Sequence, residues 1–431
     1  MIRVAVLSLF AFAGGAACGD NLAVAPDSNL GDNAPPDSDQ GEPLAMSEPG
    51  AVPLGIGFAV VNSDYHTTSI SLLDLVTGQV ANGDCINSGT RPPGNTLALS
   101  GDVALPSQPQ PGNLLVTIDH GNSVLTWIDP ATCVPLRQLD VGTGFYSNPH
   151  DVIGISPTKA YVTRYERNAA ATPDPADHDD GDDLLIIDPS IPSITGRIDL
   201  ASYAVAVAGA AIQARPDRAL VADGKLFVAL SNLAGDFRAA GTGRLVVIDP
   251  ATDAVTGVVD LPGLKNCSGL SYVETAHVLV VACGGAFSDA DQAAGSGIAY
   301  IDAAASPPVE LRRQPVTPFG GRALASLSAI ARDGALGFAV TSGEFTGGPT
   351  DQLWALDVAA ASATLLVDSS ESFTFGSVVV DRSHQRAYLP DANADHPRVQ
   401  IYSYAGAAPA LAASINANPT IGLPPREIAW Y

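Results

Sequence analysis

Short apolar runs alternate with turn-forming residues along most of the chain, and several of these runs end in an aspartate. One example is Gly243–Leu261, GRLVVIDPATDAVTGVVDL, in which an apolar run ending in Ile-Asp is followed by Pro-Ala-Thr and a second apolar run. The segment Ser123–Val141, SVLTWIDPATCVPLRQLDV, has the same arrangement much earlier in the chain. Short apolar runs bounded by Gly, Pro, Asn or Asp are typical of β-strands. Each segment therefore predicts two strands joined by a turn that contains the aspartate.

This hairpin signal recurs along the chain at intervals of 53 to 61 residues. Two further strand-like runs precede it, so that one repeat reads strand, turn, strand, loop, strand, aspartate turn, strand. A seventh repeat, Arg398–Leu411, follows at similar spacing with Ser403 in place of the aspartate. The aspartates of the other turns are Asp74, Asp129, Asp188, Asp249, Asp302 and Asp357. A fixed period with four strands per repeat predicts the blade of a β-propeller.

The two ends of the repetitive region predict how the ring closes. Residues 423–431, LPPREIAWY, read as the innermost strand of a blade, whereas the first repeat, near Phe58, lacks that strand. We therefore expect residues 55–431 to form an all-β, seven-bladed β-propeller of four-stranded antiparallel blades, closed by the C-terminal strand in the first blade. Aspartate side chains accept backbone N–H groups in tight turns. The repeated aspartates are accordingly interpreted as turn structure and not as a catalytic series.

Residues 1–17 have the features of a secretory signal peptide. One basic residue, Arg3, precedes an apolar run that is too short to span a bilayer, and small residues follow it. Cys18 comes next, so this region resembles the lipobox of bacterial lipoproteins, in which the cysteine becomes the lipidated N-terminus. Gly15 stands where that motif usually has leucine, and ordinary cleavage without lipidation is the alternative. We expect an exported lipoprotein anchored to a membrane of the bacterial cell envelope, such as the outer membrane, facing the periplasm or the surface.

Residues 18–54 differ in composition from the rest of the chain. They contain much Pro, Ser, Asn and Asp but no Lys or Arg, which predicts a disordered acidic linker behind the lipid anchor. The whole chain of 431 residues carries a formal net charge of −24. Such a field repels phosphate backbones and attracts cations and basic partners, so we expect no nucleic-acid partner. We expect a monomer that contacts the membrane only through its anchor.

Four further cysteines suggest two disulfide bonds in an exported chain. The run between Cys267 and Cys283 reads as two strands around a turn near Thr275, which sets these cysteines opposite each other. This spacing favours a bond between them and leaves Cys85 to pair with Cys133. The chain has no CxxC spacing that would favour a thiolate metal site, and it lacks the GxSxG, phosphate-loop and CxxCH motifs.

Propeller topology places two sets of loops on one face of the ring. One set joins the second and third strands of each blade, and the other joins each outermost strand to the next innermost strand. We expect ligands to bind on this face. Histidines predicted to lie there are His66, His120, His150, His178 and His396, whereas His277 and His384 are predicted in turns of the opposite face. One interpretation is a metal site lined by histidines. Its most specific version is a copper redox centre. No HxH or HExxH spacing supports it, and loops hold most polar residues in any protein.

The starts of the innermost strands should line the mouth of the central channel. Alignment on a shared proline places charged pairs at equivalent positions, and His150, Asp217 and Arg426 are the candidate catalytic residues among them. The other members of these pairs are Asp151, Arg218 and Glu427, with Asp102 as a looser match. Converging charges can bind a small polar ligand or perform acid–base chemistry. The alternative is that they form ion pairs between blades.

An acidic insertion at residues 164–183 is the candidate calcium site. Its carboxylates belong to Asp177, Asp179, Asp180, Asp182 and Asp183. Oxygen-rich loops suit Ca²⁺, but the position of Gly181 does not match the D-x-D-x-D-G calcium loop. A solvated acidic loop is the alternative. The loop at 287–297, with Asp289 and Asp291, is a weaker form of the same signal.

Two segments of the chain resemble a known repeat. PHDVIGISPTKAYVTRY, at 149–165, and GRLVVIDPATDAVTGVV, at 243–259, are similar to the YVTN repeat of seven-bladed propellers in bacteria and archaea. The resemblance extends over about residues 55–431 and implies the fold more strongly than the function, because relatives include surface proteins, binding proteins and some lactonase-like or redox enzymes. We expect a module that binds or scaffolds a protein or a small polar ligand through the loop-rich face. The alternatives are a metal-dependent hydrolase or redox enzyme at the channel mouth, and a calcium-stabilised adhesion module.

Overall fold

The computed structural model describes residues 55–431 except 288, 326–329, 333–335 and 345–346. The chain divides into two compact units, Met1–Met46 and Ser47–Tyr431, and the described residues lie in the second. The predicted signal peptide, the predicted lipidation site Cys18 and the whole acidic linker therefore lie outside the described residues. Within them, no helix is long and apolar enough to cross a membrane.

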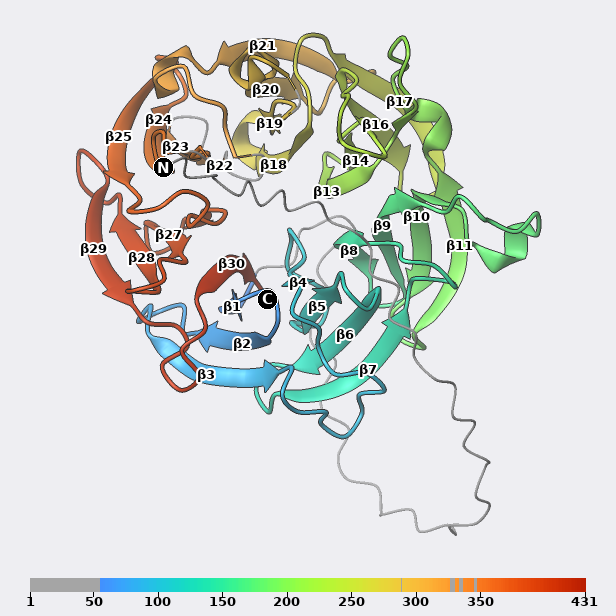
Figure 1. The fold of residues 1–431 in the computed structure, drawn as a ribbon, viewed down its shortest axis with the longest axis horizontal. Coiled ribbons are helices and arrows are strands. Elements are labelled where there is room, and N and C mark those ends of the chain that lie inside the picture. Colours follow the sequence, from blue (N-terminus) through green and yellow to red (C-terminus); the bar gives the residue numbers. More distant parts are fainter. Residues whose placement is uncertain (1–54, 288, 326–329, 333–335, 345–346) are drawn as a thin grey trace, which may run out of the picture. The chain divides into compact units, whose positions relative to one another are not determined.

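Seven four-stranded antiparallel sheets form the blades of a propeller, as the repeat predicts (Figure 1). We number the blades from the one that contains β1, and their strands are given from the innermost to the outermost. Blades 1 and 2 consist of β30 (Pro425–Trp430), β1 (Phe58–Ser63), β2 (Thr68–Leu73) and β3 (Val80–Asn87), and of β4 (Val103–Ala104), β5 (Leu115–Asp119), β6 (Val124–Asp129) and β7 (Val134–Asp140). Blades 3 and 4 consist of β8 (Pro149–Ser156), β9 (Lys159–Arg167), β10 (Gly181–Asp188) and β11 (Ser193–Asp199), and of β13 (Pro216–Ala222), β14 (Lys225–Leu230), β16 (Gly243–Asp249) and β17 (Ala254–Leu261).

The remaining blades follow the same order around the ring. Blade 5 consists of β18 (Cys267–Val273), β19 (Val278–Gly284), β20 (Ser296–Asp302) and β21 (Val309–Pro315). Blades 6 and 7 consist of β22 (Ile330–Arg332), β23 (Leu336–Thr341), β24 (Gln352–Asp357) and β25 (Ser362–Asp368), and of β26 (Val379–Asp381), β27 (Arg386–Asp391), β28 (Arg398–Ser403) and β29 (Ala410–Ile415). A small sheet of β12 (Ile212–Gln213) and β15 (Leu233–Ala234) lies in the loops of blade 4. The helices of the described chain are short 3₁₀ turns at Pro175–Asp177, Ala201–Tyr203, Glu274–Ala276, Gln292–Gly295 and Thr317–Phe319.

The ring closes between the two ends of the chain. β30 pairs antiparallel with β1, with Phe58 opposite Trp430 and Val60 opposite Ile428. The ring of Phe58 lies 4.2 Å from that of Trp430 and 4.5 Å from that of Tyr388 in blade 7. The predicted closure by the C-terminal strand in the first blade is therefore confirmed, and it carries packing to the neighbouring blade.

The core lies between the faces of neighbouring blades. The two middle strands of blade 1, β1 and β2, are buried at every position, because a blade packs on both faces. This explains why β1 begins with the continuous apolar run at residues 58–61 and does not alternate. The outermost strands alternate instead, and β17 exposes every second side chain over most of its length.

The repeated aspartates shape the turns between the third and outermost strands. In the turn after β16, Asp249 accepts the backbone N–H of Ala251 and the hydroxyl of Thr252, both at 2.9 Å. These hydrogen bonds hold the pKa of Asp249 below its usual value. Ser403, which replaces the aspartate in blade 7, accepts the N–H of Ala405 at 3.4 Å. The interpretation of this series as turn structure is confirmed.

Both predicted disulfide bonds are present. Cys267 and Cys283 face each other across β18 and β19, as the hairpin spacing predicts. The bond between Cys85 and Cys133 joins the outermost strand of blade 1 to the aspartate turn of blade 2. This second bond links neighbouring blades, and disulfides of this kind are consistent with an oxidising, exported environment.

Blade 2 departs from the repeat at its innermost strand. β4 is only two residues long, and the chain then leaves the sheet as residues 105–111, which we call the channel segment. Ser107 donates its hydroxyl to Asp151 of β8 at 2.6 Å and to the carbonyl of Ala219 of β13 at 3.1 Å. Gln110 donates to the carbonyl of Val152 at 2.9 Å. The channel segment therefore connects blade 2 to the innermost strands of blades 3 and 4.

Candidate functional site

The topology places the two predicted loop sets at one end of the ring, and we call this end the loop face. His66, His120, His178 and His396 lie in loops between second and third strands, and His150 is the second residue of β8. His277 and His384 lie in turns between first and second strands, at the opposite end. The predicted distribution of the histidines is confirmed by this strand order.

The guanidinium of Arg218 connects four blades at the inner strands. From β13 of blade 4, its Nη2 lies 2.8 Å from Oε1 of Glu427 in blade 1. Its Nη1 donates to the carbonyl of Leu105 in blade 2 at 2.7 Å and lies 3.8 Å from Oδ1 of Asp151 in blade 3. The side chain of Arg218 is only 8% exposed, and that of Asp151 is fully buried. The predicted alternative, in which the inner-strand charges form ion pairs between blades, accounts for these three residues.

The protonation of this network follows from its burial. Burial raises the pKa of Asp151, and the nearby Arg218 and hydrogen bonds from Ala219 and Ser107 only partly oppose this effect. For Arg218, burial lowers the pKa, but the carboxylates of Glu427, Asp151 and Asp217 outweigh it and raise the pKa overall. Arg218 is therefore a permanent buried cation whose removal would leave carboxylates without a counter-charge.

His150 and Asp217, two of the candidate catalytic residues, are brought together. Nδ1 of His150 lies 2.9 Å from Oδ1 of Asp217, and Ser231 donates its hydroxyl to Oδ2 of the same carboxylate at 3.0 Å. Burial lowers the pKa of His150, although Asp217 opposes the shift. Burial raises the pKa of Asp217, but its interactions with His150, Arg218 and Ser231 bring it below its usual value. A neutral His150 that donates from Nδ1 to Asp217 keeps the lone pair of Nε2 available.

Arg426, the third candidate, contacts other residues. Its guanidinium lies 4.9 Å from the centre of the Tyr65 ring, and its Nε donates to the carbonyl of Ser63 at 3.1 Å. Across the part of the chain that the structure describes, it has no hydrogen bond or ion pair to His150 or Asp217. The candidate site therefore contains the histidine and the aspartate but not the arginine.

Aromatic and guanidinium planes form a column beside this pair. The ring of His150 stacks on that of His120 at 5.2 Å and on that of Tyr165 at 4.1 Å. The guanidinium of Arg215 lies over the Tyr165 ring at 4.7 Å and over the Phe237 ring at 4.4 Å. We call these five residues the ring column. It spans blades 2, 3 and 4 on the loop face, and its stacked planes hold His150 in a defined orientation.

His120 has a free nitrogen at this column. Its Nδ1 lies 3.4 Å from Oδ1 of Asp102, and its Nε2 is buried with no hydrogen-bond partner among residues 55–431 as described. The surroundings are acidic. Burial and, after it, the charges of Asp102, Glu166 and Asp119 raise the pKa of the nearby Tyr146 to about 12. The column therefore contains two imidazole nitrogens without a hydrogen-bond partner in the described chain, and that of His120 is buried.

The predicted metal sites are only partly assembled. The described residues contain no group of three or more His, Cys, Asp or Glu side chains arranged to hold a metal ion. Of the five loop-face histidines, His120 and His150 are stacked together, and within the same ranges no ring contact joins His66, His178 or His396 to them. The histidine metal site therefore remains a prediction that rests on two imidazoles.

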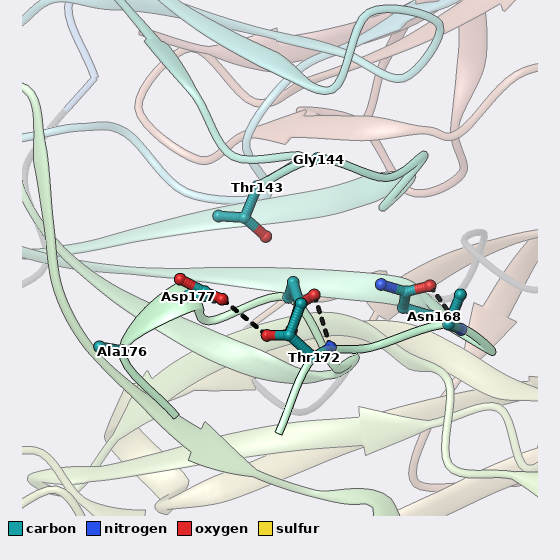
Figure 2. A pocket seen from close by; sticks show the side chains of 8 residues that line it. Thr143, Gly144, Asn168, Thr172, Ala176 and Asp177 are labelled. Carbon is teal, nitrogen blue, oxygen red and sulfur yellow. Dashed lines mark hydrogen bonds between the residues drawn. The ribbon is translucent and has the colours of Figure 1, made fainter. Parts of the chain in front are cut away.

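The five carboxylates of the calcium prediction have separate partners. Asp183 is fully buried and accepts from Arg164 and Arg197, which also pairs with Asp180. Asp182 accepts the backbone N–H groups of Ala214 and Arg215. The remaining two, Asp177 and Asp179, line an open pocket of about 660 Å³, where both accept hydrogen bonds from Thr172 (Figure 2). Calcium binding stays a prediction, and it would have to use this pair.

Aromatic side chains are exposed at one end of the molecule. Within the described chain, every exposed phenylalanine or tyrosine lies in a loop of the loop face. We call this set the aromatic rim: Tyr65, Tyr146, Phe237, Phe287 and Phe373, with exposed fractions of 39 to 69%. The opposite turns expose aliphatic residues instead, such as Val76 and Ile191. This asymmetry was not predicted from the sequence, in which histidines and charged residues were the candidates for binding.

Neither a protein-family model nor a curated protein matches the sequence. Solved propellers match the fold at low identity. A proposed 6-phosphogluconolactonase from Bacteroides fragilis has a TM-score of 0.53 and 8% identity over 88% of this chain and 98% of its own. A second one, from Bacteroides uniformis, has a TM-score of 0.53 and 11% identity over 87% of this chain and 100% of its own. The propeller domain of Cps50 (Swd1) from Myceliophteria thermophila has a TM-score of 0.52 and 12% identity over 84% of this chain and 97% of its own. These likenesses show the propeller fold alone.

Replacement of Arg218 by methionine tests the inter-blade network. The variant keeps the volume but leaves Asp151 and Glu427 without their buried cation, so we expect the free energy of unfolding to fall by about 3–5 kcal/mol. The free energy of unfolding of the double variant Arg218→Met/Glu427→Gln should fall by less than the sum of the falls in the two single variants, because the two residues share one interaction. Urea unfolding measures these differences. Arg238→Met, at an exposed ion pair, is the control and should change stability by less than about 0.5 kcal/mol. Additive losses in the double variant would contradict the network.

A second prediction concerns the pH dependence of stability. The native pKa of His150 lies below its value of 6.5 in the unfolded chain, so below about pH 6.5 the unfolded chain takes up a proton that the native site resists. Wild-type stability should therefore fall between pH 7 and pH 5 by more than that of His150→Gln. His120 and Arg218 add to this effect, while Asp217 opposes it. Melting temperatures at both pH values test it, with His277→Gln on the opposite face as control. Equal losses in wild type and His150→Gln would refute the assignment of a neutral imidazole to His150.

Proposed function

We propose that this protein is an exported, lipid-anchored propeller of the bacterial cell envelope that binds another molecule through its loop face. In this proposal Cys18 carries the anchor and residues 19–54 separate the propeller from the membrane. The propeller itself supplies a rigid binding surface. The two disulfide bonds support an exported location.

The aromatic rim is the observation that carries the binding role. Aromatic residues are enriched in binding interfaces, because they contribute a large contact area at a low cost in conformational entropy. Five exposed rings at one end of the described propeller, against aliphatic residues at the other, favour the loop face as the binding surface. The inner-strand charges are less suited to a ligand, since Arg218, Asp151 and Glu427 already satisfy one another.

Photo-crosslinking from the two faces tests this proposal. We would place the photoreactive residue benzoylphenylalanine at Tyr146 or Phe287 on the loop face, and at Val76 or Ile191 on the opposite face, in the chain expressed in its own cells. The four side chains have similar exposure, from 53 to 69%. We expect adducts from the loop-face positions only. Adducts confined to the opposite face, or equal from both faces, would reject the proposal.

The membrane anchor needs its own test, since Cys18 lies outside the described residues. Growth with radiolabelled palmitate should label the wild-type chain, and Cys18→Ala should abolish the label. Labelling that persists in the variant would reject lipidation at this cysteine.

A second candidate function is hydrolysis at the channel mouth. The observation that favours it is His150, which is neutral, oriented by Asp217 and free at Nε2, as a general base requires. The two Bacteroides propellers described as proposed 6-phosphogluconolactonases share only the fold, and they suggest lactones as the substrates to try. In this reaction Nε2 would take a proton from the water that attacks the lactone carbonyl, and Asp217 would stabilise the resulting imidazolium. The imidazolium would return the proton to the ring oxygen as the ring C–O bond breaks.

Hydrolysis of a set of γ- and δ-lactones by the purified chain tests this candidate. Activity should rise with pH through the lowered pKa of His150, because only the neutral imidazole accepts a proton. His150→Gln should lose at least about a hundredfold in kcat/KM, the usual contribution of a general base. His277→Gln, which removes an aspartate-bound histidine on the opposite face, should keep it. Wild-type rates no faster than those of His150→Gln would exclude the enzyme.

A further inference from the structure

Rings of the aromatic rim already hold cations. Arg426 lies 4.9 Å from the centre of Tyr65, and Arg215 lies 4.4 Å from that of Phe237. A guanidinium over the face of an aromatic ring is attracted by the negative charge of the π-system. In the described structure no cation lies over Tyr146 or Phe287, although their exposed fractions are 53% and 69%. Two rings of the rim are therefore open to a cation supplied by another molecule.

The loop face that carries these open rings also carries many carboxylates. Burial is the largest cause of the raised pKa of Tyr146, and the charges of Asp102 and Glu166 add to it. Both of these carboxylates are ion-paired, with His120 and Arg215. The loop that contains Phe287 also contains Asp291, which is exposed. Exposed carboxylates of the loop face with no ion-pair partner in the described chain include Asp64, Asp174, Asp177, Asp291, Glu371 and Asp395. A face that carries both exposed rings and unpaired carboxylates offers both contacts that an arginine or lysine side chain makes in an interface.

We propose that the loop face docks a basic protein segment, whose arginine or lysine side chains stack on Tyr146 and Phe287 and pair with carboxylates of the same face. This inference rests on the proposed function, because it names the partner of the same face. The net charge of −24 attracts such a segment from a distance and repels acidic partners. Charge by itself does not select a face, since carboxylates occur at both ends of the ring. The aromatic rim makes the selection.

Binding of a defined peptide tests the proposal. The probe is a fluorescent peptide in which arginine alternates with serine, measured by anisotropy against the full chain at low and at physiological ionic strength. A peptide with glutamate in place of arginine is the matched probe. We expect the arginine peptide to bind, with an affinity that falls as salt rises, and the glutamate peptide not to bind.

Matched variants locate the site. Tyr146→Ser and Phe287→Ser should each weaken binding about threefold, the change that one cation–π contact at an exposed site produces. Ile191→Ser removes an apolar side chain of similar exposure from the opposite face and should have no effect. Asp395→Asn should also weaken binding, whereas Glu274→Gln, an equal change of charge on the opposite face, should not.

Three outcomes would overturn the proposal. The first is that the arginine peptide does not bind at low salt. The second is that the variants of the opposite face weaken binding as much as those of the rim, which would mean unspecific attraction to an acidic surface. The third is that the glutamate peptide, or a neutral oligosaccharide used as a further probe, binds at least as well. If any of these occurs while photo-crosslinks still form only from the loop face, the binding role stands and the basic partner does not. Crosslinks from the opposite face would instead reject both.

Discussion

The pairing of β30 with β1 is the constraint on which the rest of the structure depends. Blade 1 takes one strand from the end of the chain and three from its beginning, so it is complete only when both ends have met. Phe58 lies between Trp430 of its own blade and Tyr388 of blade 7, which turns strand pairing into packing across the closing interface. Closure also leaves no blade without a neighbour on either face, and it protects the sheets from edge-to-edge association. The channel and the loop face exist only because the ring is closed.

Closure brings the innermost strands together and creates a problem of buried charge. A cation in such a place is stable only with well-placed partners, because its loss of hydration costs several kcal/mol. Arg218 receives its partners from blades 1, 2 and 3. The channel segment completes the arrangement, since Ser107 satisfies both carboxylate oxygens of Asp151 while the chain crosses the inner strands. The charged inner strands therefore stabilise the contact between blades.

Function is consequently expected at the loop face, where side chains remain without hydrogen-bond or ion-pair partners in the described structure. The ring column holds two imidazoles, and the aromatic rim adds exposed rings to the same face. Rigid blades with variable loops suit recognition of a partner, and one oriented histidine in the same place also suits hydrolysis. The two possibilities differ in what they require from His150: binding by the rim does not need it, whereas hydrolysis does.

The amino-acid pattern determined the features that are local or repeated. The number of blades, the aspartate turns, the closing strand and the Cys267–Cys283 bond all follow from strand periodicity, turn chemistry and hairpin register, which act over a few residues and recur with each blade. The repeat does not predict the short β4, which stops after Ala104 where the chain continues as the channel segment.

Only the tertiary structure decided which loop-face residues meet. His120 and Tyr165 stack on His150 from different loops and strands, and Arg218 and Glu427, which form an ion pair, are 209 residues apart in the chain. The sequence placed His150, Asp217 and Arg426 at equivalent positions, but it could not show that the first two pair while the third turns to Tyr65. Residues at equivalent positions of the innermost strands still differ in the direction of their side chains and in their neighbours. Contacts between blades depend on how the closed ring packs, and no local pattern of residues records that packing.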